Sequence, residues 1–198
     1  MTETEIANLA LARLNQDPIV SLEDGSDRGK KVRTIYPAAI ATFLAAHEWQ
    51  FARRIDIPAR LDIEPKAYQF AYALPEDCIK LISVSMREKA RSFGERDSRR
   101  APVPYEMIGD VVWTDCDRVC LEITTNRVAV SDFPAYATDA LAFRVAAELS
   151  LVLKNSTARM QEMTQQYQMA LSLAIKNDSK NVSVKRLGGV HYADARSW

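Results

Sequence analysis

Apolar residues near both ends of the chain recur every three or four positions, which is the spacing of amphipathic helices. The first helix is predicted to stop before Asp17-Pro18, because a residue that precedes proline is biased away from helical backbone angles. A second helix is predicted from about residue 27 to residue 51, with a kink or a later start at Pro37. Two more helices follow the middle of the chain, one capped by Asp132 and one beginning at Ser156.

The middle of the chain, from about residue 55 to residue 125, instead alternates apolar and polar side chains as half-buried strands do. The predicted strands lie around residues 68–72, at 79–86 and at 119–125. Residues 104–114 form a predicted hairpin whose two-residue loop is Gly109-Asp110. Glycine at the first loop position favours a type II′ turn. These segments together predict a small antiparallel sheet.

The order of these patterns predicts the fold class and the division of the chain. We expect a mainly α protein with a β insertion (α+β), in which residues 1–56 and 132–178 form a four-helix bundle. Residues 57–131 form the inserted antiparallel β subdomain. Residues 179–198 contain two glycines and several basic residues but no periodicity, so we expect an extended C-terminal tail.

Composition narrows the classes of protein that fit. The chain has 198 residues, with 26 lysines and arginines balanced by 26 aspartates and glutamates, which argues against a strongly basic nucleic-acid binder. It contains no apolar run of the roughly 18 to 20 residues that a membrane-spanning helix needs, so no membrane partner is expected. The N-terminus lacks the pattern of a signal peptide, which predicts synthesis in a cytoplasm.

The sequence contains none of the common catalytic motifs, and we expect neither an enzyme nor a cofactor. Its three cysteines and two histidines do not combine into the four ligands of a structural zinc site, so no metal is expected. His47 lies in an apolar helical stripe beside Trp49 and is interpreted as a packing residue. Asp115 and Asp117 are interpreted as turn formers, with a pair of catalytic carboxylates as the alternative.

One segment, residues 87–100, concentrates basic side chains and is a candidate contact loop for a neighbouring subunit or for DNA phosphates. The alternative is a solvated loop between strands. Its basic residues are Arg87, Lys89, Arg91, Arg96, Arg99 and Arg100.

The C-terminal tail keeps apolar and aromatic residues among its basic ones. Such a tail can become ordered in a partner's groove or on a sheet edge, although a frayed terminus is the alternative interpretation. Its apolar residues are Val182, Val184, Leu187, Val190, Tyr192 and Trp198.

Five segments, in this order and at this spacing, resemble the head-to-tail adaptor (connector) family of short-tailed phages, the tail tubular protein A type. The resemblance covers about residues 5 to 176. The segments are ANLALARLNQDPIVSL at 7–22, YP at 36–37, LAAHEWQFA at 44–52, YQFAYALPEDC at 68–78 and YEMIGDVVWTD at 105–115.

The resemblance implies a virion protein of the neck, made in the bacterial host cytoplasm, with twelve copies forming a ring under the portal protein. Such a ring seals the channel after packaging, presents a surface for the tail nozzle or other tail proteins, and lets double-stranded DNA pass without sequence-specific binding. By position, residues 187–198 would dock to the portal. The docking residues it implies are Leu187, His191, Tyr192, Arg196 and Trp198.

One position departs from the family pattern, because Asn15 stands where a glycine usually ends the first helix. Asparagine tolerates left-handed backbone angles, so the helix stop is expected to survive.

Three alternatives remain open at this point. The first is a tail-tube terminator or stopper-type connector of a long-tailed phage or phage-derived particle. The second is a small cytoplasmic enzyme whose catalytic residues come from the β insertion. The third is a DNA-binding module that uses residues 87–100.

Overall fold

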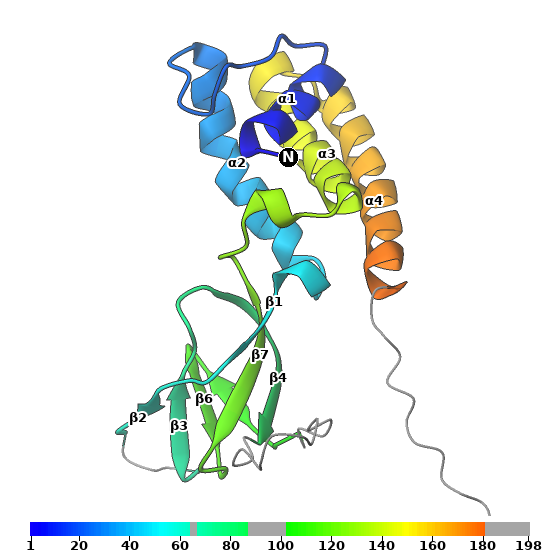
Figure 1. Cartoon of the computed structure of the whole chain (residues 1–198). Helices are drawn as coiled ribbons and strands as arrows, with labels where there is room; N and C mark the ends of the chain where they lie inside the picture. Colours follow the sequence, from blue (N-terminus) through cyan, green and yellow to red (C-terminus); the bar gives the residue numbers. More distant parts are fainter. Residues whose placement is uncertain (64–66, 87–101, 181–198) are drawn as a thin grey trace, which may run out of the picture.

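The computed structural model describes residues 1–63, 67–86 and 102–180. Within these ranges the fold is mixed, with four α-helices and two small antiparallel sheets. Figure 1 shows the helices at one end of an elongated molecule and the sheets at the other end. None of the described helices is long and apolar enough to span a membrane.

Helix α1 (Glu3–Arg13) begins and ends with the local signals that its sequence predicts. The Thr2 hydroxyl and the Glu5 carboxylate form a reciprocal capping box at its start. At its end Asn15 adopts a left-handed φ of 52°, and the Gln16 N–H donates to the Leu11 carbonyl at 3.0 Å. This is the Schellman arrangement, so the predicted helix stop at asparagine is confirmed.

Helix α2 (Asp27–Ala45) starts where predicted, with the Ser26 hydroxyl accepting the Gly29 N–H, and it continues through Pro37. The prediction that it runs to residue 51 is wrong, because the chain turns after Ala45. The turn brings the Trp49 ring back against Phe43, where its indole N–H donates to the Phe43 carbonyl at 3.0 Å. Burial of this ring therefore decides where the helix ends.

Helices α3 (Ala135–Lys154) and α4 (Thr157–Lys180) are joined by Asn155, which has a left-handed φ of 46°. The prediction that Asp132 caps α3 is wrong. Pro134 occupies the N-cap position, and Asp132 ends a short 3₁₀ turn, η2 (Val130–Asp132). The intervening Phe133 is extended and buries its ring in the helical core, which places the carboxylate too far from the helix start.

Helix α3 lies at the centre of the helical part. It packs along α4 on one side and against α1 and α2 on the other, as Figure 1 shows. One apolar core joins these helices and includes the stripe of α4 that periodicity predicts, with Met163, Tyr167 and Ala174 buried.

The β part contains a three-stranded sheet of order β1-β7-β4 and a four-stranded sheet of order β2-β3-β6-β5. All of its pairs are antiparallel. The strands are β1 (Arg53–Asp56), β2 (Arg60–Leu61), β3 (Phe70–Ala73), β4 (Cys78–Met86), β5 (Glu106–Ile108), β6 (Val111–Thr114) and β7 (Val119–Thr125).

The facing sheets enclose a second, smaller core that includes Tyr72, Val84, Val112 and Leu121. The β5–β6 hairpin turns at Gly109, whose φ of 60° fits the first loop position of the predicted type II′ turn. Strand β1 was not predicted, because its partner β7 is more than 60 positions away in the sequence.

Candidate functional site at the junction of the two parts

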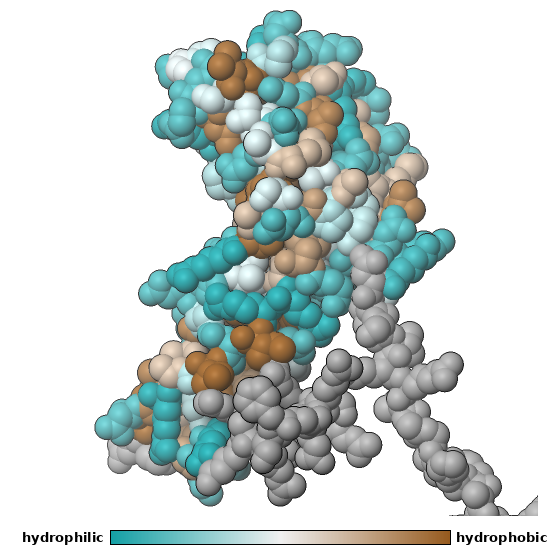
Figure 2. All heavy atoms as spheres, viewed as in Figure 1, coloured by the Kyte–Doolittle hydropathy of each residue, from teal (hydrophilic) through white to brown (hydrophobic). Residues whose placement is uncertain are grey.

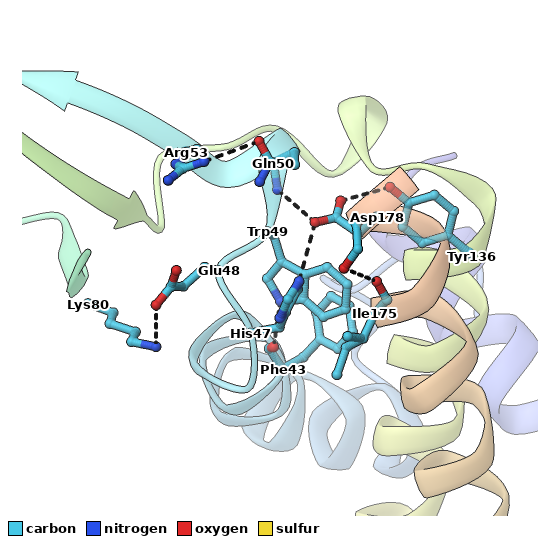
Figure 3. Close-up of polar contacts among 11 residues, drawn as sticks. Phe43, His47, Glu48, Trp49, Gln50, Arg53, Lys80, Tyr136, Ile175 and Asp178 are labelled. Atoms are coloured by element: carbon cyan, nitrogen blue, oxygen red, sulfur yellow. Dashed lines mark hydrogen bonds and ion pairs between the residues drawn. The ribbon is translucent and has the colours of Figure 1, made fainter. Parts of the chain in front are cut away.

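Asp178, in the last turn of α4, is fully buried where the helical part meets the β part. One carboxylate oxygen accepts the Gln50 backbone N–H at 3.0 Å, and the other accepts the Tyr136 hydroxyl at 2.9 Å. The Nε2 atom of His47 lies 3.5 Å from the first oxygen. Figure 3 shows the three groups converging on this carboxylate from the α2–β1 connection and from α3.

The turn after α2 positions His47 and Gln50, two of the three groups that face the Asp178 carboxylate. Trp49 is fully buried and stacks on Phe43 with the ring centroids 4.7 Å apart. The His47 and Trp49 rings are nearly perpendicular, with their centroids 5.0 Å apart, and the His47 Nε2 lies 3.5 Å from the Asp178 carboxylate. A 3₁₀ turn, η1 (Gln50–Ala52), follows and presents the Gln50 N–H to the same carboxylate.

A second buried carboxylate, that of Asp77, lies in the β part just before β4. The Arg54 guanidinium contacts both of its oxygens, at 2.7 and 2.9 Å, and the Thr125 hydroxyl donates to it at 2.6 Å. Burial by itself raises the pKa of Asp77. The hydrogen bond from Thr125 and the charge of Arg54 outweigh burial, so the pKa of this carboxyl lies below its ordinary value of 3.8.

Partly exposed ion pairs also lie at the junction of the two parts. The Lys80 ammonium on β4 lies 2.9 Å from the Glu48 carboxylate, and both side chains are more than two-fifths exposed. The Arg53 side chain lies between the Gln50 amide oxygen and the Glu122 carboxylate of β7, its Nε 2.8 Å from the latter. The junction is thus tied by one buried carboxylate and by pairs nearer the surface.

The chemistry of the Asp178 cluster favours holding segments together over reacting with a substrate. Its carboxylate is 1% exposed, so a substrate has no path to it in this conformation. Its partners come from two parts of the chain, the α2–β1 connection and α3, which the fold brings to the end of α4. We interpret Asp178 as the anchor that fixes the end of α4 against the α2–β1 connection.

The structure adds a role to His47 that sequence reasoning missed. The predicted packing against Trp49 is present, but the ring also faces Asp178. Asp178 itself was missed, although it stands four residues after the buried Ala174 on the apolar stripe of α4. A carboxylate in such a stripe is a signal, because a buried charge needs hydrogen-bonding partners.

The contacts of Asp115 and Asp117 fit turn formers. The Asp115 carboxylate accepts the Gln69 backbone N–H at 3.0 Å, and that of Asp117 lies 3.4 Å from Arg60. The Tyr72 hydroxyl donates to the Asp117 carbonyl at 2.6 Å and closes the same β6–β7 turn.

The cysteines Cys78, Cys116 and Cys120 are all free thiols. Among the residues that the structure describes, no group of three or more His, Cys, Asp or Glu side chains is placed to hold a metal ion.

Both predicted contact segments lie outside the described residues. This applies to the basic loop, Arg87 to Arg100, and to the docking residues from Leu187 to Trp198. Helix α4 extends to Lys180, so the prediction of an extended tail is wrong for residues 179 and 180. The Ser179 hydroxyl donates to the Ile175 carbonyl within that last turn. Asp178 therefore directly precedes the predicted tail, which contains the docking residues.

No protein-family model matches this chain, and no curated protein sequence matches it. The resemblance to head-to-tail adaptors therefore rests on the sequence segments quoted above, and a function built on it is a proposal.

Proposed function

We propose that this protein is a structural virion component, a head-to-tail adaptor that forms a ring between the portal and the tail and helps to close the DNA channel after packaging. In this proposal the helices are the four-helix bundle of such adaptors, and the β part faces the tail proteins. Residues 181–198 of each copy bind the portal. The proposal draws on the family resemblance and on the elongated arrangement of the two parts.

The observation that carries the proposal is the buried anchor at Asp178. It lies three residues before residue 181 and fixes the last turn of α4 by hydrogen bonds to Gln50 and Tyr136. A docking segment that starts from a fixed point searches a smaller volume, which raises its effective concentration at a partner site. Fixing the residue from which the tail starts therefore favours binding of the tail to the portal.

The balanced charge of the chain is compatible with this role. A ring that surrounds DNA must let the duplex slide, and many phosphate contacts would oppose sliding. The equal numbers of acidic and basic residues fit a channel component better than a DNA-binding module.

The test is portal binding by the full chain and by a chain truncated after Lys180, which keeps α4 and Asp178 intact. We expect the truncated protein to unfold at the same temperature as the full chain and to lose binding to the portal protein of the same genome. A matched control replaces Leu187, Tyr192 and Trp198 with alanine in the full-length chain, and it is expected to weaken binding without changing stability.

Two results would contradict the proposal. Unchanged portal binding by the truncated chain would remove the docking role of residues 181–198. Absence of binding by the full chain to an assembled portal would favour a tail-tube terminator or stopper, which binds a different neighbour.

A further inference from the structure

Strand β5 forms one edge of the four-stranded sheet, and its outer side has no pairing strand among the described residues. It pairs with β6 alone in the order β2-β3-β6-β5. All three of its residues are exposed, and Met107 and Ile108 are 53% and 59% exposed although both are large and apolar. An exposed apolar edge is a template for pairing with another strand, so proteins usually protect such edges.

The other three edge strands of the described sheets carry such protection. Strand β2 has only two residues, and its Arg60 guanidinium lies over the Phe70 ring and close to Asp117. Strand β1 carries two arginines and one aspartate among its four residues. The Val84 carbonyl of β4 accepts the Val103 N–H, so part of that edge is occupied. Among the edge strands that the structure describes, β5 is therefore the one that is both apolar and open.

The hydrogen bonds of β6 show which backbone groups of β5 point outward. The Asp110 carbonyl accepts the Leu74 N–H at 2.9 Å, so position 110 bonds toward β3. Backbone groups alternate in direction along a strand, so Val112 also bonds toward β3, and the positions on either side of it bond toward β5. Met107 stands opposite Val112 in the register. Its N–H and carbonyl therefore point away from β6, toward an incoming strand.

A pocket lies beside the same face of the sheet. Met107 shares this face with its register partner Val112, which is buried in the core between the two sheets. Thr114 lies two residues farther along β6 on the same face and lines a pocket of about 480 Å³. The apolar residues that line it are Met86, Val103 and Pro104. An added strand can therefore place one apolar side chain on Met107 and another, two residues away, in the pocket.

The charges around this edge are mainly acidic. Residues 103–118 contain four acidic residues and one basic residue. The acidic ones are Glu106, Asp110, Asp115 and Asp117. Arg60 compensates Asp117 at 3.4 Å, but Glu106 and Asp110 have no cationic partner among the described residues. A strand that carries lysine or arginine complements this edge, whereas β5 of a second copy would bring like charges together.

The position of the edge in the molecule fits a contact with another protein. Figure 2 shows hydrophobic surface on the β part, below the hydrophilic band at its junction with the helices. In the proposed function this part of the molecule faces the tail proteins. In strand addition, main-chain hydrogen bonds supply affinity, and pockets for alternate side chains supply specificity. The open edge of β5 offers the first, and the pocket next to it offers the second.

From these observations we infer that the outer edge of β5 binds an extended segment of a tail protein as an added strand. That segment has apolar side chains at two alternate positions and a lysine or arginine beside them. One apolar side chain packs on Met107, and the other enters the pocket next to Thr114. The inference rests on the proposed function and identifies the site at which the ring binds the tail protein.

The experiment compares Met107→Pro with Met107→Ala in full-length chains assembled on the portal protein, and it measures binding of the tail nozzle protein of the same genome. Proline removes the N–H that points away from β6 and keeps the bonds to β6, so both variants should unfold at similar temperatures. Met107→Pro is expected to weaken nozzle binding by at least about tenfold. Met107→Ala is the matched control, because it loses the same side chain but keeps the N–H, and its loss should be smaller.

Hydrogen–deuterium exchange tests the same edge without a substitution. The Met107 amide is expected to exchange quickly in the chain alone, and at least about tenfold more slowly when the nozzle protein is bound. Slow exchange in the chain alone would mean that residues of this chain, such as 87–101, already occupy the edge, and it would overturn the inference.

A third variant, Glu106→Gln with Asp110→Asn, tests the charge of the partner strand. It is expected to weaken nozzle binding and to make that binding less sensitive to added salt, because two attractive charges are removed. Equal binding and equal salt dependence in the wild type and this variant would contradict a basic partner strand.

The outcomes separate this inference from the proposed function. A ring that forms on the portal and binds the nozzle protein equally well with Met107→Pro overturns the inference and leaves the adaptor role in place. A ring that forms on the portal but binds no nozzle protein does the same. A failure of the wild-type chain to bind the portal contradicts the adaptor role itself, and with it the inference.

Discussion

The helical part and the β part each contain a buried aspartate near the junction, but they compensate its charge in different ways. Asp77 is held by the Arg54 guanidinium and the Thr125 hydroxyl, and Arg54 remains about one-third exposed. Asp178 is held by a backbone N–H, a phenol hydroxyl and a histidine from segments far apart in the sequence. The first is an ion pair close to water, whereas the second is a closed anchor that depends on the position of α4.

This difference predicts how strongly the substitution of each aspartate lowers the stability of the fold. When either Asp77 or Arg54 is replaced, water can reach the partner that remains, because the pair lies close to the surface on the Arg54 side. When Asp178 is lost, the partly buried Gln50 and Tyr136 lose the fully buried carboxylate that holds the end of α4, and the loss of hydrogen bonds to a charged acceptor is costly.

The largest expected effect is therefore at Asp178. Replacement Asp178→Ala should lower the free energy of unfolding by about 3 kcal/mol, because it removes the charged acceptor of two hydrogen bonds that fix the end of α4. Urea denaturation measures this, with Asp62→Ala at an exposed aspartate as the control. A loss at Asp178 no larger than that of the control would contradict the anchor.

The next effect is at Asp77. Replacement Asp77→Ala is expected to cost about 2 kcal/mol, less than at Asp178, because Arg54 keeps part of its hydration. The same denaturation experiment compares the two variants directly. If Asp77→Ala proves the more destabilising, the comparison between a closed anchor and a hydrated ion pair is wrong.

Acid should remove the contribution of Asp77. Its pKa in the folded protein is lowered, so its carboxylate stabilises the fold above the unfolded pKa of about 4, and this contribution disappears as the pH falls through the folded pKa. The stability difference between the wild type and Asp77→Asn should therefore be constant from pH 7 to about pH 5 and shrink below that. A stability difference that grows as the pH falls would contradict a lowered pKa of Asp77.

The smallest effect is expected at the exposed pair that also spans the junction. Lys80→Ala removes the ion pair with Glu48, and pairs this exposed contribute less than about 1 kcal/mol. Its effect should also fall with added salt. A loss comparable to that of Asp178→Ala would mean that surface pairs, and not the buried anchor, hold the two parts together.

Local signals allowed much of the fold to be predicted from the sequence. The stop at Asn15 and the hairpin at Gly109 each depend on a residue that accepts left-handed backbone angles, and both appear as expected. The end of α2 was not predicted, because it depends on where the Trp49 ring packs in the folded core. Pairing of β1 with β7 likewise joins segments that no local pattern connects.

The candidate site was harder to predict than the fold. His47 was noted as a packing residue, but its second partner lies in α4, 131 positions later in the sequence. Periodicity gives the buried face of α4, and Asp178 on that face indicates a need for partners. Only the tertiary structure identifies those partners as Gln50 and Tyr136.

Electron microscopy of this protein mixed with the portal protein from the same genome tests the central claim most directly. The adaptor account predicts a ring that caps the narrow end of the portal and that is lost when residues 181–198 are removed. Full-length protein that leaves a correctly assembled portal uncapped would contradict the account.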